Sequence, residues 1–152
     1  MNPIFNPYLP LSEYIPDGEP HVFGDRVYVY GSHDKEGGDF FCMLDYVTYS
    51  ASVYDLTDWR YEGVIYRASQ DPHYPAHRYM YAPDVVRGND GRYYLYYSLA
   101  DRKDCSFLMS VAVSDSPAGP FEFHGYVRYP DGRLLQDGVI FDPGLINDDG
   151  RV

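Results

Sequence analysis

Residues 83–97 read PDVVRGNDGRYYLYY, and residues 16–30 read PDGEPHVFGDRVYVY. Each stretch places an Asp beside a Pro, then a short apolar run, a turn with Gly and Asp or Asn, an Arg, and a run rich in Tyr and Val. Gly, Asn and Asp tolerate the positive φ angles that tight hairpin turns require. Each stretch therefore predicts two antiparallel strands joined by a short turn.

A third copy of this pattern begins at residue 142 and reads DPGLINDDGR. In the three copies the Asp precedes the Arg by nine, eight and nine residues, respectively: Asp17 to Arg26, Asp84 to Arg92, and Asp142 to Arg151. The opening Asp residues are 67 and then 58 positions apart. A unit that recurs at similar spacing indicates a repeat architecture.

Two further β-rich runs complete each of the first two units. The predicted strands are 19–23, 27–32, 43–53, 61–66, 85–87, 93–99, 108–114 and 122–127. Four strands per unit are typical of a β-propeller blade, and a two-sheet sandwich would not explain three aligned units. The period exceeds the ~40–50 residues of common propeller repeats, so long loops are expected at 34–40 and 68–81.

We therefore predict an all-β fold in which residues 1–152 form part of one β-propeller domain. The first blade covers about 15–67, the second about 81–128, and the first hairpin of a third about 139–152. An open ring of blades exposes unpaired strand edges. We accordingly expect self-association, or pairing with the missing half of the propeller.

Composition and charge limit the classes of partner. The net charge of −11 and the pI of about 4.6 argue against nucleic acid and anionic membranes. No apolar run is long enough for a membrane span, and the first residues lack signal-peptide features, so the cytoplasm is the default expectation and a secreted parent protein stays open. Cys42 and Cys105 are expected to be buried free thiols. No metal-ligand spacing occurs among the His residues at positions 21, 33, 73, 77 and 124.

The repeated Asp residues suggest a chemistry. The first strand of each propeller blade lines the central axis, so an Asp at the same point of successive blades places several carboxylates around one pocket. Glycoside hydrolysis uses such a set, because one carboxylate deprotonates water and one carboxylic acid protonates the leaving oxygen. For any single Asp, capping of a turn is the competing interpretation.

Three segments together resemble glycoside hydrolase family 43: IPDGEPHVFGDRVYVYGSHD at 15–34, YAPDVVRGNDGRYYLYYS at 81–98 and IFDPGLINDDGR at 140–151. The resemblance runs from about residue 6 to the end of the chain. It implies a five-bladed propeller that hydrolyses by inversion, on β-xylosides, α-L-arabinofuranosides and related plant polysaccharides. A divalent ion on the propeller axis occurs in some relatives, but these residues predict no cofactor.

The resemblance also implies roles for individual residues. Asp17 matches the general base, and Asp142 matches the Asp that orients the general acid and tunes its pKa. Asp84 matches the Asp of a Trp-Ala-Pro-Asp signature, as a structural or pocket-lining residue, with Tyr81 in place of the Trp. The general acid is a Glu of a later blade, which no residue here matches. We therefore expect the isolated chain to be inactive.

Other candidates follow from position. Glu19 shares a strand face with Asp17 and could be a second pocket carboxylate. Tyr81 can stack on a sugar face, and His33 follows the predicted inner strand and could line the pocket. The alternatives are a non-catalytic carbohydrate-binding propeller piece and a retaining relative that acts on fructosides, although 16–19 lack the Asn residues of that group's nucleophile motif.

Overall fold

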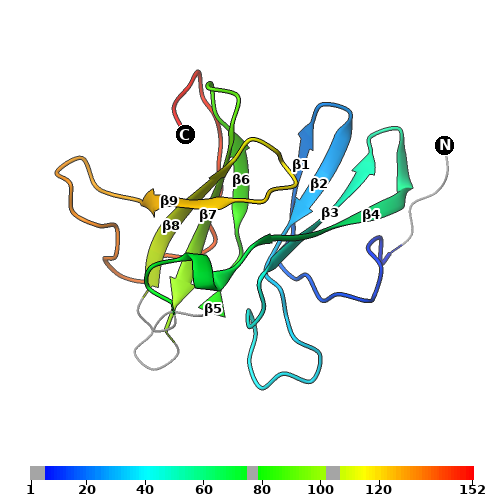
Figure 1. Cartoon of the computed structure of the whole chain (residues 1–152), viewed down its shortest axis with the longest axis horizontal. Coiled ribbons are helices and arrows are strands. Elements are labelled where there is room, and N and C mark those ends of the chain that lie inside the picture. Colours follow the sequence, from blue (N-terminus) through cyan, green and yellow to red (C-terminus); the bar gives the residue numbers. More distant parts are fainter. Residues whose placement is uncertain (1–5, 75–78, 102–106) are drawn as a thin grey trace.

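Both complete repeat units form antiparallel sheets in the computed structural model, which describes residues 6–74, 79–101 and 107–152 (Figure 1). The first sheet has the order β1-β2-β3-β4. Its strands are β1 Glu19–Phe23, β2 Arg26–Tyr30, β3 Tyr46–Ser52 and β4 Asp55–Tyr66. Strands that neighbour each other in sequence therefore also neighbour each other in the sheet.

The second sheet repeats this meander. Its strands are β5 Tyr79–Met80, β6 Asp84–Arg87, β7 Tyr93–Ala100, β8 Phe107–Ser114 and β9 Glu122–Tyr126. Both β5 and β6 pair with β7, and β8 and β9 follow outward. A short 3-10 helix, η1 Ala68–Gln70, lies between β4 and β5. The all-β prediction is confirmed, although β5 was not predicted and β4 begins at Asp55 instead of residue 61.

The hairpin turns form where the sequence predicted them. Phe23 pairs with Arg26, so Gly24 and Asp25 make a two-residue turn in which Gly24 has a φ of 66°. A positive φ at this position costs glycine little and other residues more. The turn sequence thus sets the register of β1 against β2.

The core lies between the two sheets and is rich in tyrosine. Four tyrosines have no exposed surface: Tyr30, Tyr46, Tyr66 and Tyr97. Their hydroxyl groups are paired, since Tyr66 and Tyr97 share a hydrogen bond of 2.7 Å and Tyr30 donates to the Pro117 carbonyl at 2.7 Å. Buried phenols need such partners. The high tyrosine content therefore forms a core in which hydrogen bonds between buried hydroxyl groups and their partners add to the apolar packing.

The third unit lies against the second sheet instead of forming a sheet of its own. Ser98 donates to the Ile140 carbonyl at 2.7 Å, and the Asn147 amide donates to the Arg87 carbonyl at 2.8 Å. Residues 139–152 contain an isolated bridge between Asp148 and Arg151, which closes the predicted turn, but no strand. Nowhere in the described part of the chain is a helix long and apolar enough to cross a membrane.

Candidate active site

The first and third Asp of the repeat share an unusual backbone conformation. Asp17 has a φ of 55° and Asp142 a φ of 53°, in the left-handed region where Asp and Asn are the commonest non-glycine residues. Both residues are exposed, and within the described residues neither carboxylate accepts a hydrogen bond. Turn-capping Asp residues differ, because the carboxylates of Asp90 and Asp131 each accept from the backbone N–H two residues ahead. Turn capping therefore does not explain Asp17 and Asp142.

The charge of Asp17 acts on Asp142. Asp142 is exposed as a residue, but part of its carboxyl group is shielded from water; this partial desolvation is the main cause that raises the pKa of the carboxyl above its usual range, and the negative charge of Asp17 adds to it. Burial also raises the pKa of the Cys42 thiol to about 11, with Asp17 and Asp142 among the charges that contribute. The structure thus brings together Asp17 from the segment before β1, Cys42 from the loop after β2 and Asp142 from the third unit.

Three aromatic rings pack together where the residues directly before Cys42 and Asp142 meet Tyr81. The ring of Tyr81 meets Phe41 edge-on at 5.5 Å and lies 5.9 Å from Phe141. Phe41 is 45% exposed and directly precedes Cys42, and Phe141 is 44% exposed and directly precedes Asp142. Exposed rings of this kind offer apolar faces to a ligand. We call Phe41, Tyr81 and Phe141 the aromatic wall.

The loop that carries Phe41 is held in place by hydrogen bonds of the Cys42 backbone. The Asp34 carboxylate accepts a hydrogen bond from the Cys42 backbone N–H at 2.6 Å, and the Cys42 carbonyl accepts one from Met80 at 3.1 Å. Cys42 is buried and has a φ of 57°. These contacts join the loop after β2 to β5 and hold Phe41 beside the second sheet.

Asp84, the second Asp of the repeat, occupies a different position. It is only 2% exposed, and both of its carboxylate oxygens accept hydrogen bonds from other residues of the chain. Oδ1 lies 2.5 Å from His21 Nε2 and 2.7 Å from the Val85 nitrogen, and Oδ2 lies 2.7 Å from the Leu145 nitrogen. This geometry favours a supporting role for Asp84 over direct contact with a sugar.

The other predicted site residues also divide into buried and accessible ones. His33 is buried, with Nδ1 donating to the Asp45 carbonyl at 2.7 Å and Nε2 at 2.8 Å from Glu13 Oε2, so both ring nitrogens are engaged within the fold. Glu19 is exposed at the start of β1. Tyr81 is half-buried in the aromatic wall. Of these residues, Glu19 and Tyr81 remain accessible to a ligand, whereas His33 does not.

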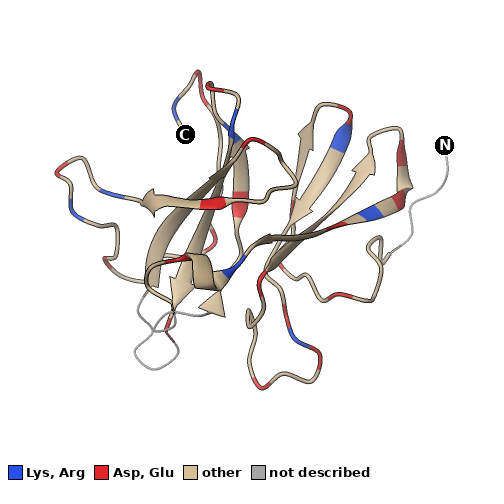
Figure 2. Cartoon of the chain, viewed as in Figure 1, with Lys and Arg blue, Asp and Glu red and all other residues tan. Residues whose placement is uncertain are grey.

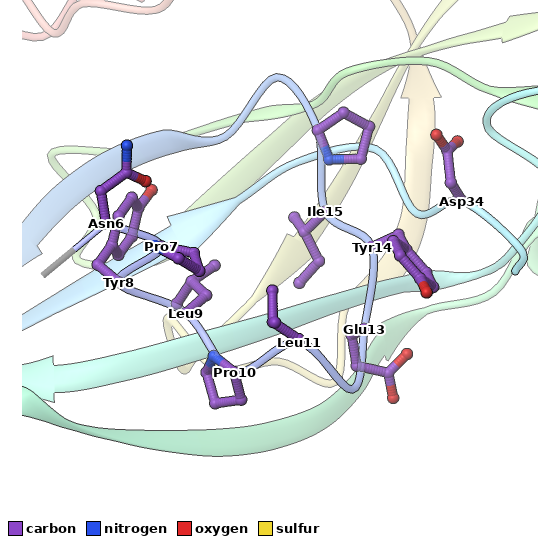
Figure 3. A pocket seen from close by; sticks show the side chains of 11 residues that line it. Asn6, Pro7, Tyr8, Leu9, Pro10, Leu11, Glu13, Tyr14, Ile15 and Asp34 are labelled. Carbon is purple, nitrogen blue, oxygen red and sulfur yellow. The ribbon is translucent and has the colours of Figure 1, made fainter.

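A separate pocket of about 360 Å³ lies nearby, on the N-terminal segment. Figure 3 shows its walls, which are formed by residues 6–11 and 13–16 with Asp34. Neither Asp17 nor Asp142 lines it, so this pocket is separate from the carboxylate pair. Acidic positions recur in the loops around both sheets (Figure 2), yet no group of three metal-binding side chains occurs within 6–74, 79–101 and 107–152.

Comparison with known proteins identifies the family. The family model of glycosyl hydrolases family 43 matches residues 7–152. The chain belongs to this family. A xylosidase/arabinosidase of Thermoclostridium stercorarium is 57% identical over 152 aligned residues, covering 97% of this chain and 31% of that protein. Xylosidase/arabinosidase 43A of Humicola insolens is 34% identical, covering 90% of this chain and 41% of that protein.

Solved family 43 structures match the fold as well. A β-xylosidase/α-arabinofuranosidase from a compost metagenome, in complex with xylotriose, superimposes with a TM-score of 0.74 at 31% identity. The superposition covers 99% of this family 43 chain and 44% of the metagenome enzyme. A GH43_1 enzyme of Xanthomonas citri with xylotriose gives a TM-score of 0.73 at 29% identity, over 93% of this chain and 39% of that one. The chain therefore spans less than half the length of these relatives.

Sequence reasoning missed several members of the site. His21 follows Asp17 by four residues and reaches Asp84, a pairing that alternation along β1 could have suggested. Phe141 directly precedes a motif Asp, which is a usable signal for a pocket aromatic. Phe41 carries no comparable signal, because its position depends on how the loop after β2 folds back.

Proposed function

We propose that this family 43 chain supplies the general-base side of the active site of an inverting glycosidase that acts on xylose- or arabinose-containing glycans. Asp17 takes a proton from water, whose oxygen bonds to the anomeric carbon as the glycosidic C–O bond breaks. A carboxylic acid outside these 152 residues gives its proton to the leaving oxygen. Asp142 orients that acid and adjusts its pKa.

The observation that carries this proposal is the carboxylate pair itself. Asp17 and Asp142 are exposed, have left-handed backbone conformations and have no hydrogen-bond partner among the described residues, while the charge of Asp17 helps raise the pKa of Asp142. A carboxyl whose pKa is raised by burial and by a neighbouring negative charge is characteristic of sites that move protons. In this proposal the two sheets are the first two blades of a five-bladed propeller.

The aromatic wall supports a sugar as the ligand. Phe41 and Phe141 are partly exposed, and Phe141 directly precedes Asp142, which suits a pyranose or furanose ring with an apolar face and polar edges. Two of the solved relatives hold xylotriose. Glu19 is the further carboxylate that we place within reach of the sugar hydroxyls.

A chimera tests the proposal. This chain would replace the matching 31% of the Thermoclostridium stercorarium relative. We expect the chimera to hydrolyse aryl β-xyloside or aryl α-L-arabinofuranoside with inversion, read by proton NMR of the first product anomer. Asp17→Asn should lower kcat by at least about a hundredfold. The 152-residue chain alone should give no turnover above background. Clear turnover by this chain would contradict the proposal that the general acid lies outside these residues.

A carbohydrate-binding role without hydrolysis is the second candidate, favoured by the exposed aromatic wall. Calorimetric titration of the chain with xylotriose and arabino-oligosaccharides separates the two when combined with the chimera assay. Binding by the chain together with an inactive chimera would support the non-catalytic role. Binding together with an Asp17-dependent chimera supports the glycosidase.

A further inference from the structure

The buried carboxylate of Asp84 joins two segments that are distant in sequence. His21, on β1, lies 63 positions before it, and Leu145, in the third unit, lies 61 positions after it. His21 follows Asp17 by four residues and Leu145 follows Asp142 by three. Each oxygen of Asp84 thus holds the chain just beyond one of the exposed carboxylates.

This arrangement depends on a buried carboxylate with its hydrogen-bond donors in place. Burying a carboxylate is costly unless hydrogen bonds replace its water shell, and charge-assisted hydrogen bonds are the strongest of these. Asp84 receives donors from His21, Val85 and Leu145. The donors of His21 and Leu145 come from outside its own strand, so Asp84 ties these two segments to β6.

We propose that Asp84 is a positioning residue that sets the separation of Asp17 and Asp142, with His21 as its partner on β1. The proposal rests on the proposed function for its catalytic meaning, but its geometry does not. An Asn at 84 can keep its oxygen toward His21 and Val85, and its NH2 group then opposes the Leu145 N–H. Asp84→Asn should therefore release the Asp142 segment first.

A second buried carboxylate gives a matched control. Asp71 is also 2% exposed and accepts hydrogen bonds from Tyr97 at 2.7 Å and Tyr126 at 3.2 Å. Its partners lead to neither Asp17 nor Asp142. Asp71→Asn therefore removes a comparable buried charge without loosening the carboxylate pair.

The test is carboxyl-carbon NMR titration of Asp142 in the 152-residue chain. The titratable neighbours of this pair, Cys42, Tyr46 and Asp34, are unchanged in both variants. We expect the Asp142 midpoint to move toward its ordinary value in Asp84→Asn and to keep its wild-type position in Asp71→Asn. An unmoved midpoint in Asp84→Asn, or equal shifts in both variants, would overturn the proposal.

The His21 arm provides a second pair of variants if Asp84→Asn does not fold. His21→Gln retains a side-chain N–H donor and should keep the wild-type Asp142 midpoint, whereas His21→Leu should shift it. Equal behaviour of the two variants contradicts the role of His21.

In the chimera, Asp84→Asn should lower kcat about tenfold to a hundredfold, as small displacements of catalytic groups do, with KM little changed. An equal loss in Asp71→Asn would overturn the positioning role. If the unsubstituted chimera is inactive, the proposed function fails, and the NMR comparison still decides the role of Asp84.

Discussion

Backbone strain in this chain gathers around the exposed carboxylates. Four non-glycine residues of the described structure have positive φ, and three of them are Asp17, Cys42 and Asp142; the fourth, Asp149, belongs to a turn. Holding a residue in this region costs free energy that the surrounding fold must offset, and such residues cluster at functional sites. The strain here falls on two carboxylates and on the buried thiol whose pKa they help to raise.

The raised pKa of Asp142 has a consequence for stability. A carboxyl whose pKa is higher in the folded state binds its proton more tightly there, so its contribution is full below the unfolded value of about 3.9. That contribution is lost as pH rises through the folded pKa. We therefore expect Asp142→Asn to gain stability relative to the wild type between pH 3 and pH 7. Urea unfolding at both pH values measures this, and a relative loss at pH 7 contradicts it.

The Cys42 thiol should be chemically inert in the folded chain. It is 3% exposed, and burial with nearby carboxylates raises its pKa to about 11, so little thiolate forms at pH 8. In a Cys105→Ser background, which removes the other thiol, we expect Ellman's reagent to react slowly without denaturant and rapidly in urea. Rapid reaction in the folded chain would contradict the buried position of Cys42.

At the scale of elements, the loop between β2 and β3 positions one face of the aromatic wall. Asp34 fixes the end of this loop through the Cys42 N–H. Asp34→Ala should lower the free energy of unfolding by about 1–3 kcal/mol, because it leaves a buried donor unpaired. It should also weaken any xylotriose binding, through a displaced Phe41. Asp34→Asn retains an acceptor oxygen and serves as the control, and equal effects of both variants would show that charge matters instead.

Most elements could be predicted, because alternation and turn chemistry are local. The turn at Gly24 and the strands around it follow from neighbouring residues. The first half of β4 escaped prediction because residues 55–60 are largely polar and gain their strand conformation from pairing with β3. The turn of the third unit could be predicted, but its flanking strands do not form in 139–152.

The candidate site was only partly predictable for a related reason. Spacing within the repeat picked out Asp17, Asp84 and Asp142, but it treats all three as equivalent. The structure separates them, since Asp84 is buried among donors from other segments and the other two are exposed. Such a difference depends on contacts across more than 60 positions, which a local pattern does not contain.

At the scale of the whole molecule, the turn between β8 and β9 of the second sheet is hydrogen-bonded to the first sheet. The turn between β8 and β9 brings the Phe121 N–H to the Ile65 carbonyl at 2.8 Å and the Pro117 carbonyl to the Tyr30 hydroxyl. Gln70 also donates to the Phe121 carbonyl at 2.9 Å. This junction, with the tyrosine core beneath it, sets the angle between the sheets and thus the position of the loops that carry the site.

Gly119 allows this junction to be tested. It has a φ of 69°, and a Cβ there would lie 3.0 Å from the Ile65 carbonyl oxygen. Gly24 has nearly the same φ, 66°, with nothing within 4 Å, so Gly24→Ala should cost only the conformational penalty of about 1 kcal/mol. Gly119→Ala should cost about 1–3 kcal/mol more, because the added methyl forces the sheets apart. Urea unfolding of both variants measures the difference, and equal losses would mean that the turn yields freely and does not fix the two sheets.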